Sequence, residues 1–144
     1  MSTNNFYRNL GYCFHLLTHS NTHKEFNLAD YMDVEICPAN WRGQLRVYDN
    51  DENQPIGFVT WAKVNENTKQ ELIQDSRALY HREWSSGDLL FFNDFVAPWG
   101  GVKEILSDLT STVFPKEQAF SISRDKHGKT KKVHRWTGKE YANQ

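Results

Sequence analysis

The chain has 144 residues, of which 38% are hydrophobic and 24% charged, a composition that predicts a single folded domain over residues 1–144. Its apolar runs are too short to span a membrane, and its N-terminal residues lack the basic and apolar segments of a secretory signal, so we expect neither. The two cysteines, Cys13 and Cys37, have no CxxC spacing, which is typical of ordinary thiols in a reducing cytoplasm.

The first predicted elements alternate between helix and strand. Helical spacing of apolar residues predicts an amphipathic helix over about residues 5–19. Thr22 and Glu25 form a candidate capping box, which would place His23 at the start of a short second helix. Two β-rich segments then predict an antiparallel pair of strands. These strands cover residues 44–48 and 56–63.

The second half opens with another candidate capping box, Thr68 and Glu71, which predicts a helix that continues through Leu79. Leu89–Val96 is too apolar for a surface helix and predicts a central strand buried on both faces. Glycines then end this strand before further apolar residues at helical spacing. The remaining predicted elements are a helix over 102–113, strands over 119–123 and 132–136, and a frayed polar tail over 139–144.

Although the net charge of the chain is −1, one segment is strongly basic. Residues 124–139 contain seven of the 17 lysines and arginines but only one acid, Asp125, which gives this segment a charge of +6. It is either a solvated edge strand, a nucleic-acid patch that uses its cations and Trp136, or a docking site for an acidic protein. The docking candidates are Lys126, Lys129, Lys131, Lys132 and Arg135.

A single carboxylate, Asp94, lies near the end of the apolar strand. Burying it without a partner would cost several kcal/mol, so it should meet a cation, meet a hydrogen-bond donor or face a cleft. The stretch around it, WSSGDLLFFNDFVAPWG, resembles the signature of the RTX toxin-activating lysine acyltransferases, the hemolysin-activating family. The resemblance covers roughly residues 10–138 and includes Leu10-Gly11, Ser20 and His23 near the N-terminus.

This resemblance implies an α+β, single-domain fold that is GNAT-like (similar to N-acetyltransferases), with a mixed central sheet flanked by helices. The catalytic residues that it implies are His23 and Asp94, with Ser20 in support. The implied reaction moves a fatty acyl group from acyl carrier protein, where it is a 4'-phosphopantetheine thioester, to internal lysines of an RTX protoxin. We accordingly expect no bound cofactor, no nucleic acid and a cytoplasmic location, and we leave open a homodimer. The alternative is a non-catalytic or retargeted member of the family that acts as a protein-binding module.

The residue types fit this chemistry. A lysine must lose a proton before it attacks a thioester, and a histidine supported by a carboxylate is the usual base at neutral pH. Direct attack and a covalent acyl-imidazole or acyl-serine intermediate both stay open. Ser20 is either a hydrogen-bonding partner of His23 or a helix cap.

Three further features bear on ligands. His15, His19 and His23 are four residues apart, a spacing that binds zinc on a continuous helix, but the break at residues 20–22 argues against a metal, and we expect none. Gly100-Gly101 would expose a helix N-terminus to the phosphate of the donor. The candidates for lining an acyl groove are Phe92, Phe95 and Trp99.

The chain departs from the family pattern in two places. Ser123 stands where the family has an arginine on the penultimate strand, and Arg124 follows one residue later. Either the register shifts by one residue or that contact is lost. The chain also ends soon after Trp136, from which we expect weaker docking or dimer formation.

Overall fold

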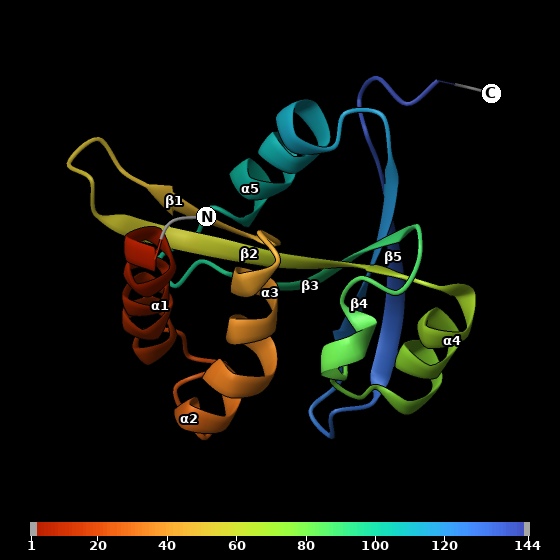
Figure 1. Cartoon of the computed structure of the whole chain (residues 1–144), viewed down its shortest axis with the longest axis horizontal. Coiled ribbons are helices and arrows are strands. Elements are labelled where there is room, and N and C mark those ends of the chain that lie inside the picture. Colours follow the sequence, from red (N-terminus) through yellow and green to blue (C-terminus); the bar gives the residue numbers. More distant parts are fainter. Residues whose placement is uncertain (1–2, 143–144) are drawn as a thin grey trace. The chain divides into compact units, whose positions relative to one another are not determined.

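The protein has an α+β fold, seen here in a computed structural model that describes residues 3–142. Five strands form one mixed sheet in the order β1-β2-β3-β4-β5, so β3 is its central strand (Figure 1). The strands are β1 Leu45–Asp49, β2 Pro55–Val64, β3 Leu89–Val96, β4 Gln118–Arg124 and β5 Thr130–Thr137. The helices are α1 Thr3–Thr18, α2 Leu28–Tyr31, η1 Met32–Ile36, α3 Cys37–Trp41, α4 Glu66–Asp75, η2 His81–Glu83, α5 Val102–Asp108 and η3 Leu109–Val113.

Helices and strands that were predicted from the spacing of apolar residues are present in the structure. The predicted N-terminal helix is α1, and the predicted central strand is β3 with the same bounds. The two strands predicted over residues 44–48 and 56–63 are β1 and β2, which pair antiparallel. None of the helices formed by residues 3–142 has the length and apolar character that a membrane crossing requires.

The capping box predicted at Thr68 is wrong, because an earlier residue caps the helix. The side chain of Asn65 accepts a hydrogen bond from the backbone N–H of Thr68 at 2.8 Å, so α4 begins at Glu66. The helix also stops before Leu79, since Ser76 takes a left-handed backbone conformation with φ of 53°.

The chain divides into two compact units, and both β2 and β3 contribute to each of them. The first unit contains the chain up to Thr60 together with Asp94–Ile105. The second contains Trp61–Asn93 and the chain from Leu106 onward. Each unit has its own buried apolar side chains, such as Leu16 and Phe58 in the first and Trp84 and Leu72 in the second.

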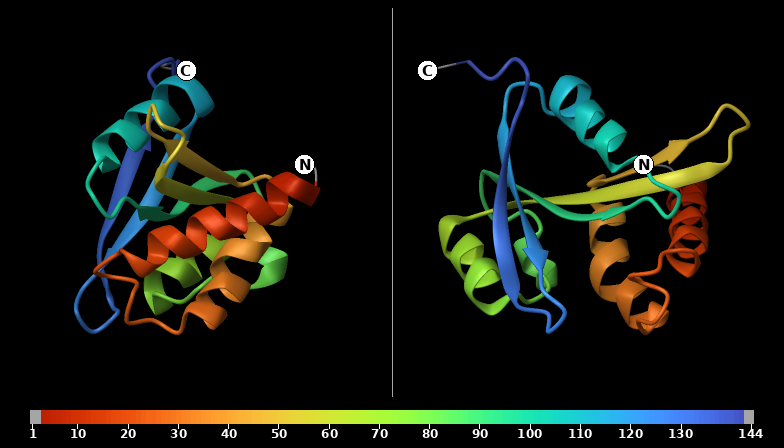
Figure 2. Two further views of the ribbon diagram at one scale, coloured as in Figure 1. Left: turned by 90° about the vertical axis from the view of Figure 1, so that its left-hand side faces the viewer. Right: turned by 180° about the vertical axis from the view of Figure 1, so that it is seen from behind.

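In the first unit, α1 packs against η1, α3 and β1 (Figure 2). Its buried face carries Cys13, Leu16 and Leu17, none of which is exposed to solvent. Gly57 on β2 allows a close approach of the chain that follows Asp94, because a Cβ at this position would lie 3.0 Å from the carbonyl oxygen of Val96. A larger residue at position 57 would push away the end of the strand that carries Asp94.

In the second unit, β3 and β4 run parallel, and β4 and β5 form an antiparallel hairpin. Helix α4 packs against β5, and the hydroxyl of Thr130 donates to the carbonyl of Ile73 at 2.7 Å. The signature residue Gly87 fits only as glycine, because a Cβ there would lie 2.5 Å from the backbone of Val64 and Asn65. This part of the signature therefore serves the fold.

The tail predicted to be frayed is partly anchored in the second unit. The backbone N–H groups of Lys139 and Glu140 donate to the carbonyls of Thr110 and Pro115, at 2.9 and 2.7 Å. The preceding Gly138 lies so close to Pro115 that a Cβ would be 2.4 Å from its carbonyl oxygen. Residues 143–144 of the predicted tail lie outside the described residues.

Candidate active site

His23 lies on a loop of successive turns between α1 and α2, and the prediction that it starts a helix is wrong. The backbone N–H groups of His23 and Lys24 both donate to the carbonyl of Ser20, at 3.1 and 2.9 Å. The next helix begins later, because Asn27 caps α2 by accepting from the N–H of Asp30 at 3.1 Å. The loop holds the imidazole in place with backbone bonds and leaves both ring nitrogens for side-chain partners.

The ring of His23 connects Ser20 to Asp94 within the first unit. Its Nδ1 lies 2.6 Å from Ser20 Oγ, and its Nε2 lies 2.8 Å from Asp94 Oδ2. Ser20 and His23 are buried, with 8% and 6% of their surface exposed, whereas the side chain of Asp94 keeps 23%. The structure thus brings together the three residues predicted for catalysis, and Ser20 bonds to the imidazole.

Asp94 determines which ring nitrogen is free to act as a base. An ionised carboxylate only accepts hydrogen bonds, so Nε2 of His23 must carry the proton that it donates to Asp94. In the neutral ring Nδ1 then has the lone pair, and the Ser20 hydroxyl donates to it. The order hydroxyl, imidazole, carboxylate is that of a catalytic triad, with Nδ1 as the basic nitrogen.

Tyr31 is a fourth member of this cluster that the sequence did not indicate. Its hydroxyl donates to Asp94 Oδ2, the same oxygen that accepts from His23. Burial, followed by the negative charge of Asp94, raises the pKa of Tyr31 well above its ordinary value of 10.0, so the phenol stays protonated. The only sequence signal was the expectation that Asp94 would need a donor, and no spacing pattern pointed to Tyr31.

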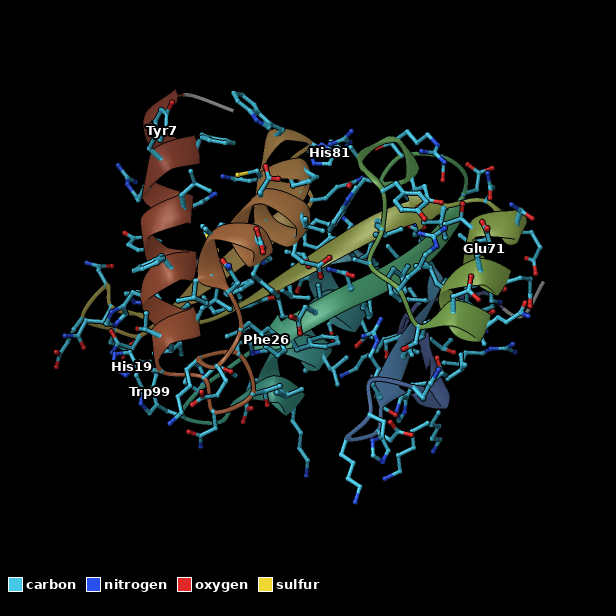
Figure 3. All side chains as sticks on the ribbon, turned by 90° about the horizontal axis from the view of Figure 1, so that it is seen from below. Tyr7, His19, Phe26, Glu71, His81 and Trp99 are labelled. Carbon is cyan, nitrogen blue, oxygen red and sulfur yellow. The ribbon has the colours of Figure 1, made fainter. Side chains whose placement is uncertain are left out.

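Exposed aromatic rings lie around this cluster. The ring of Phe26 is 5.4 Å from that of His23, and Phe26 is 49% exposed. Trp99 is 59% exposed and lies 5.4 Å from the ring of His19, at the end of α1 that leads into the loop (Figure 3). These side chains give the first unit apolar surface that is accessible to a ligand.

The predicted acyl-groove residues belong to both units and differ in exposure. Phe92 belongs to the second unit, where it is 1% exposed and its ring lies 6.1 Å from that of Phe114. Phe95 belongs to the first unit and is half-buried. Among these three candidates, Trp99 presents the most exposed surface.

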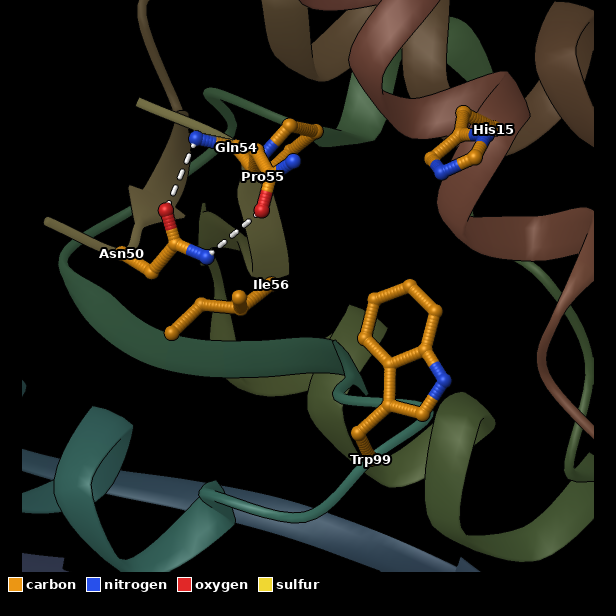
Figure 4. A pocket seen from close by; sticks show the side chains of 6 residues that line it. All are labelled: His15, Asn50, Gln54, Pro55, Ile56 and Trp99. Carbon is orange, nitrogen blue, oxygen red and sulfur yellow. Dashed lines mark hydrogen bonds between the residues drawn. The ribbon is translucent and has the colours of Figure 1, made fainter. Parts of the chain in front are cut away.

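Trp99 lines a pocket of about 380 Å³ in the first unit. His15 of α1 lies beside Trp99, and the amides of Asn50 and Gln54, which bond to each other at 3.0 Å, lie on the other side of the pocket (Figure 4). Ile56 adds the main aliphatic surface. The lining is mixed, so Trp99 and Ile56 offer contact for apolar atoms and the amides for polar ones.

The sequence raised two further ligand sites, a histidine cluster for a metal and a helix N-terminus for a phosphate. His15 and His19 lie beside Trp99, whereas His23 is engaged with Ser20 and Asp94. Over residues 3–142, no three His, Cys, Asp or Glu side chains come together as metal ligands do. Helix α5 after Gly100-Gly101 has only seven residues and carries Glu104 in its first turn, a charge that disfavours a phosphate.

The basic segment forms the β4–β5 hairpin of the second unit. The five docking candidates, Lys126, Lys129, Lys131, Lys132 and Arg135, are all exposed. The pairing shifts register between Ser123 and Arg124, and the guanidinium of Arg124 donates to the hydroxyl of Ser76 at 2.8 Å. Arg124 thereby ties the hairpin to the end of α4.

The α+β fold thus holds a hydroxyl–imidazole–carboxylate chain, an arrangement of groups that is chemically capable of general base catalysis. The sequence model of the RTX toxin acyltransferase family matches residues 2–137, and the chain belongs to this family. This confirms the resemblance inferred from the signature around Asp94.

Individual relatives agree with this assignment. The lysine-acyltransferase RtxC of Vibrio cholerae is 31% identical over 99 residues, which are 69% of this chain and 64% of that protein. An uncharacterized protein of Synechocystis sp. is 35% identical over 95 residues, 65% of each chain. The RTX-I toxin-activating lysine-acyltransferase ApxIC of Actinobacillus pleuropneumoniae is 26% identical over 129 residues, 90% of this chain and 73% of that protein. The chain therefore spans less than two thirds of the Vibrio and Synechocystis proteins.

Proposed function

We propose that the chain is a protein-lysine acyltransferase that moves a fatty acyl group from acyl carrier protein to the ε-amine of internal lysines of an RTX protoxin. The observation that carries this proposal is the His23 imidazole held between Ser20 and Asp94 in a member of the RTX toxin acyltransferase family. A base at this position meets the main chemical requirement of the reaction, because a lysine attacks a thioester only after losing a proton.

In the proposed reaction, Nδ1 of His23 receives the proton of the substrate ammonium, and Asp94 stabilises the resulting imidazolium through Nε2. The lysine nitrogen attacks the thioester carbonyl, the new C–N bond forms and the C–S bond breaks. The proton on His23 then passes to the leaving thiolate, and the second proton that the nitrogen loses as it becomes an amide passes to solvent. No net redox change occurs, and the imidazole returns to its neutral form.

Two routes for this step differ in the role of Ser20. Its hydroxyl already donates to Nδ1, so it either passes the proton from the lysine to the ring or attacks the thioester itself to form an acyl-serine. Replacing Ser20 by Ala leaves Nδ1 open to the lysine. A direct route then survives with reduced rate, whereas an acyl-serine route is lost. Mass spectrometry of the enzyme mixed with acyl carrier protein alone detects or excludes the covalent intermediate.

The exposed aromatics of the first unit suit the acyl chain. Phe26 lies next to the His23 ring and is half exposed, and Trp99 lies at the end of α1 that leads into the same loop. A fatty chain resting on such rings would leave water and gain about 0.8 kcal/mol per buried methylene. We assign the acyl chain to this surface and not to Phe92, which is enclosed in the second unit.

The β4–β5 hairpin suits the donor protein. Acyl carrier proteins are acidic, and the five exposed cations from Lys126 to Arg135 supply the opposite charge. Arg135 and Lys69 also line a cavity of about 150 Å³ in the second unit, with Phe120 at its wall. The parallel β3–β4 pair with a helix following β3 supports the GNAT-like fold. A cytoplasmic location is part of the same proposal, since it would give the protein access to acyl carrier protein.

The test is an incubation of the protein with acyl carrier protein that bears a radiolabelled acyl chain and with an RTX protoxin. Label should appear in an amide bond on protoxin lysines, and His23→Ala should abolish this transfer. His81→Ala is the matched control, since His81 is an exposed histidine of the second unit and should transfer label like the wild type. Protoxin that binds without receiving label would instead identify a non-catalytic binding protein.

A further inference from the structure

Tyr31 is a buried titratable side chain of the first unit that the reaction above does not use. It is 9% exposed and ends the four-residue helix α2, whose cap is Asn27. Its ring lies 5.4 Å from the ring of His23 and nearly perpendicular to it, at 79°. The phenol is thereby held against the imidazole and carboxylate by both packing and the backbone of α2.

The direction of the hydrogen bond between Tyr31 and Asp94 follows from the groups around the phenol. Asp94 of β3 faces the hydroxyl directly, while Glu35 of η1 and Cys13 of α1 are the other titratable groups that act on it. A carboxylate beside a phenolate would repel it, so Tyr31 remains the donor and Asp94 the acceptor. Asp94 Oδ2 therefore accepts from two donors, the phenol and the imidazole.

Two donors on one oxygen fix the carboxylate more firmly than one. The side chain of Asp94 keeps 23% of its surface exposed, so with His23 as its single partner it could rotate toward water. The hydroxyl of Tyr31 opposes that rotation and keeps Oδ2 aimed at Nε2 of His23. The proton then stays on Nε2, and Nδ1 remains the basic nitrogen that faces Ser20.

We propose that Tyr31 is a positioning residue for acyl transfer: through Asp94 it holds His23 in the tautomer whose basic nitrogen is Nδ1. This inference rests on the proposed function for its kinetic consequence. Its structural part, the tautomer of His23, is independent of any substrate.

The test compares Tyr31→Phe with Tyr7→Phe, which removes the same hydroxyl from a 64% exposed tyrosine of α1. Tyr31→Phe should lower kcat roughly tenfold to a hundredfold, the kinetic equivalent of one hydrogen bond to a charged group. The KM values for acyl carrier protein and protoxin should stay within about twofold of the wild type, because Tyr31 is buried. Tyr7→Phe should leave kcat unchanged.

The spectroscopic readout is the ¹⁵N NMR signal pair of the His23 ring in the protein without substrate. The wild type should show a protonated Nε2 and an unprotonated Nδ1, whereas Tyr31→Phe should shift both signals toward a mixture of tautomers. In an Asp94→Asn background, Tyr31→Phe should cause little further loss of kcat, because the two residues act in series. Introducing 3-fluorotyrosine at position 31 keeps the hydroxyl but makes it a stronger donor, and should move the His23 signals in a folded protein.

Unchanged His23 signals in both the Tyr31→Phe and fluorotyrosine proteins would overturn the inference. A full additional loss of kcat in the Asp94→Asn background would also overturn it, since Tyr31 would then act independently of Asp94. If the wild type transfers no acyl group, the proposed function fails, while the ring-nitrogen signals still decide whether Tyr31 sets the tautomer.

Discussion

Each of the two units contains a carboxylate with polar partners, buried in the case of Glu83 and half-buried in the case of Asp94, and the two clusters differ in their chemistry. In the second unit, both oxygens of Glu83 bond to the guanidinium of Arg77 at 2.8 Å. Glu83 also accepts from the backbone N–H of Tyr80 at 2.8 Å. In the first unit, Asp94 bonds to two groups without permanent charge, the phenol of Tyr31 and the imidazole of His23.

The difference lies in where a proton can go. Arg77 holds its charge throughout the accessible pH range, and the Glu83 carboxylate beside it has a pKa lowered from 4.5 to about 2. Both members of this pair are therefore charged and hydrogen-bonded to each other, and neither exchanges a proton near neutral pH. An imidazole, unlike a guanidinium, can accept and release a proton in general acid–base chemistry, and Nδ1 of His23 is the ring nitrogen that does not contact Asp94. Asp94 therefore has a partner that can gain or lose a proton, whereas Glu83 is paired with a guanidinium that keeps its charge.

The largest expected effect comes from converting the carboxylate of the first unit to an amide. Asp94→Asn keeps the shape and a hydrogen-bonding oxygen but loses the charge that stabilises a protonated His23. We expect kcat for acyl transfer to fall about 10³-fold, within the range known for supporting carboxylates and general bases. The melting temperature should change little, and a variant with near wild-type kcat would contradict the role of Asp94.

The same conversion in the second unit should affect stability and not catalysis. Glu83→Gln removes the charge of the carboxylate that Arg77 contacts at 2.8 Å, and leaves this 17% exposed guanidinium with the longer ion pair to Glu71 at 3.4 Å. We expect the free energy of unfolding to fall by about 3 kcal/mol, as measured by urea denaturation. The kcat per folded molecule should equal that of the wild type, whereas a selective loss of kcat would show that Glu83 also serves the reaction.

The contribution of the Glu83–Arg77 pair to stability should also depend on pH. Because the pKa of Glu83 is about 2 in the folded state and 4.5 as an ordinary value, its contribution to stability is complete above pH 4.5. It is lost as the pH falls from 4.5 toward 2, and amounts to about 3 kcal/mol at 1.36 kcal/mol per pKa unit. The stability difference between wild type and Glu83→Gln should therefore be constant from pH 5 upward and shrink below about pH 4.5. A difference that persists undiminished at pH 2.5 would contradict the ion pair as its source.

The smallest expected effect concerns the surface of the second unit. Reversing the charges of Lys126 and Lys131 on the β4–β5 hairpin should raise the KM for acyl carrier protein roughly threefold to tenfold and flatten its dependence on salt. The KM for the protoxin and the melting temperature should stay nearly constant, because both side chains are exposed. An equal effect on both substrates, or none, would show that the hairpin is only a solvated edge.

Much of the fold could be predicted from the sequence because it follows local periods. The bounds of β3 and the presence of α1 follow from apolar spacing, which is set by the burial of one face or of both. Helix starts were less predictable, since Asn27 and Asn65 replaced the expected threonines as caps. Several side chains near a helix start can accept the same N–H groups, and tertiary packing selects among them.

The sequence by itself determined the family, the five strands, the longer helices and the residue types of the site, since apolar spacing, the signature around Asp94 and the Ser20–His23 spacing are local. Only the tertiary structure decided that His23 meets Asp94, 71 residues away, and that Tyr31 shares the same carboxylate oxygen. The same holds for the assignment of Nδ1 as the basic nitrogen, which depends on which partner each ring nitrogen contacts. The physical reason is that these contacts join a loop without periodicity to a strand and a four-residue helix, and packing of the whole unit fixes their distances.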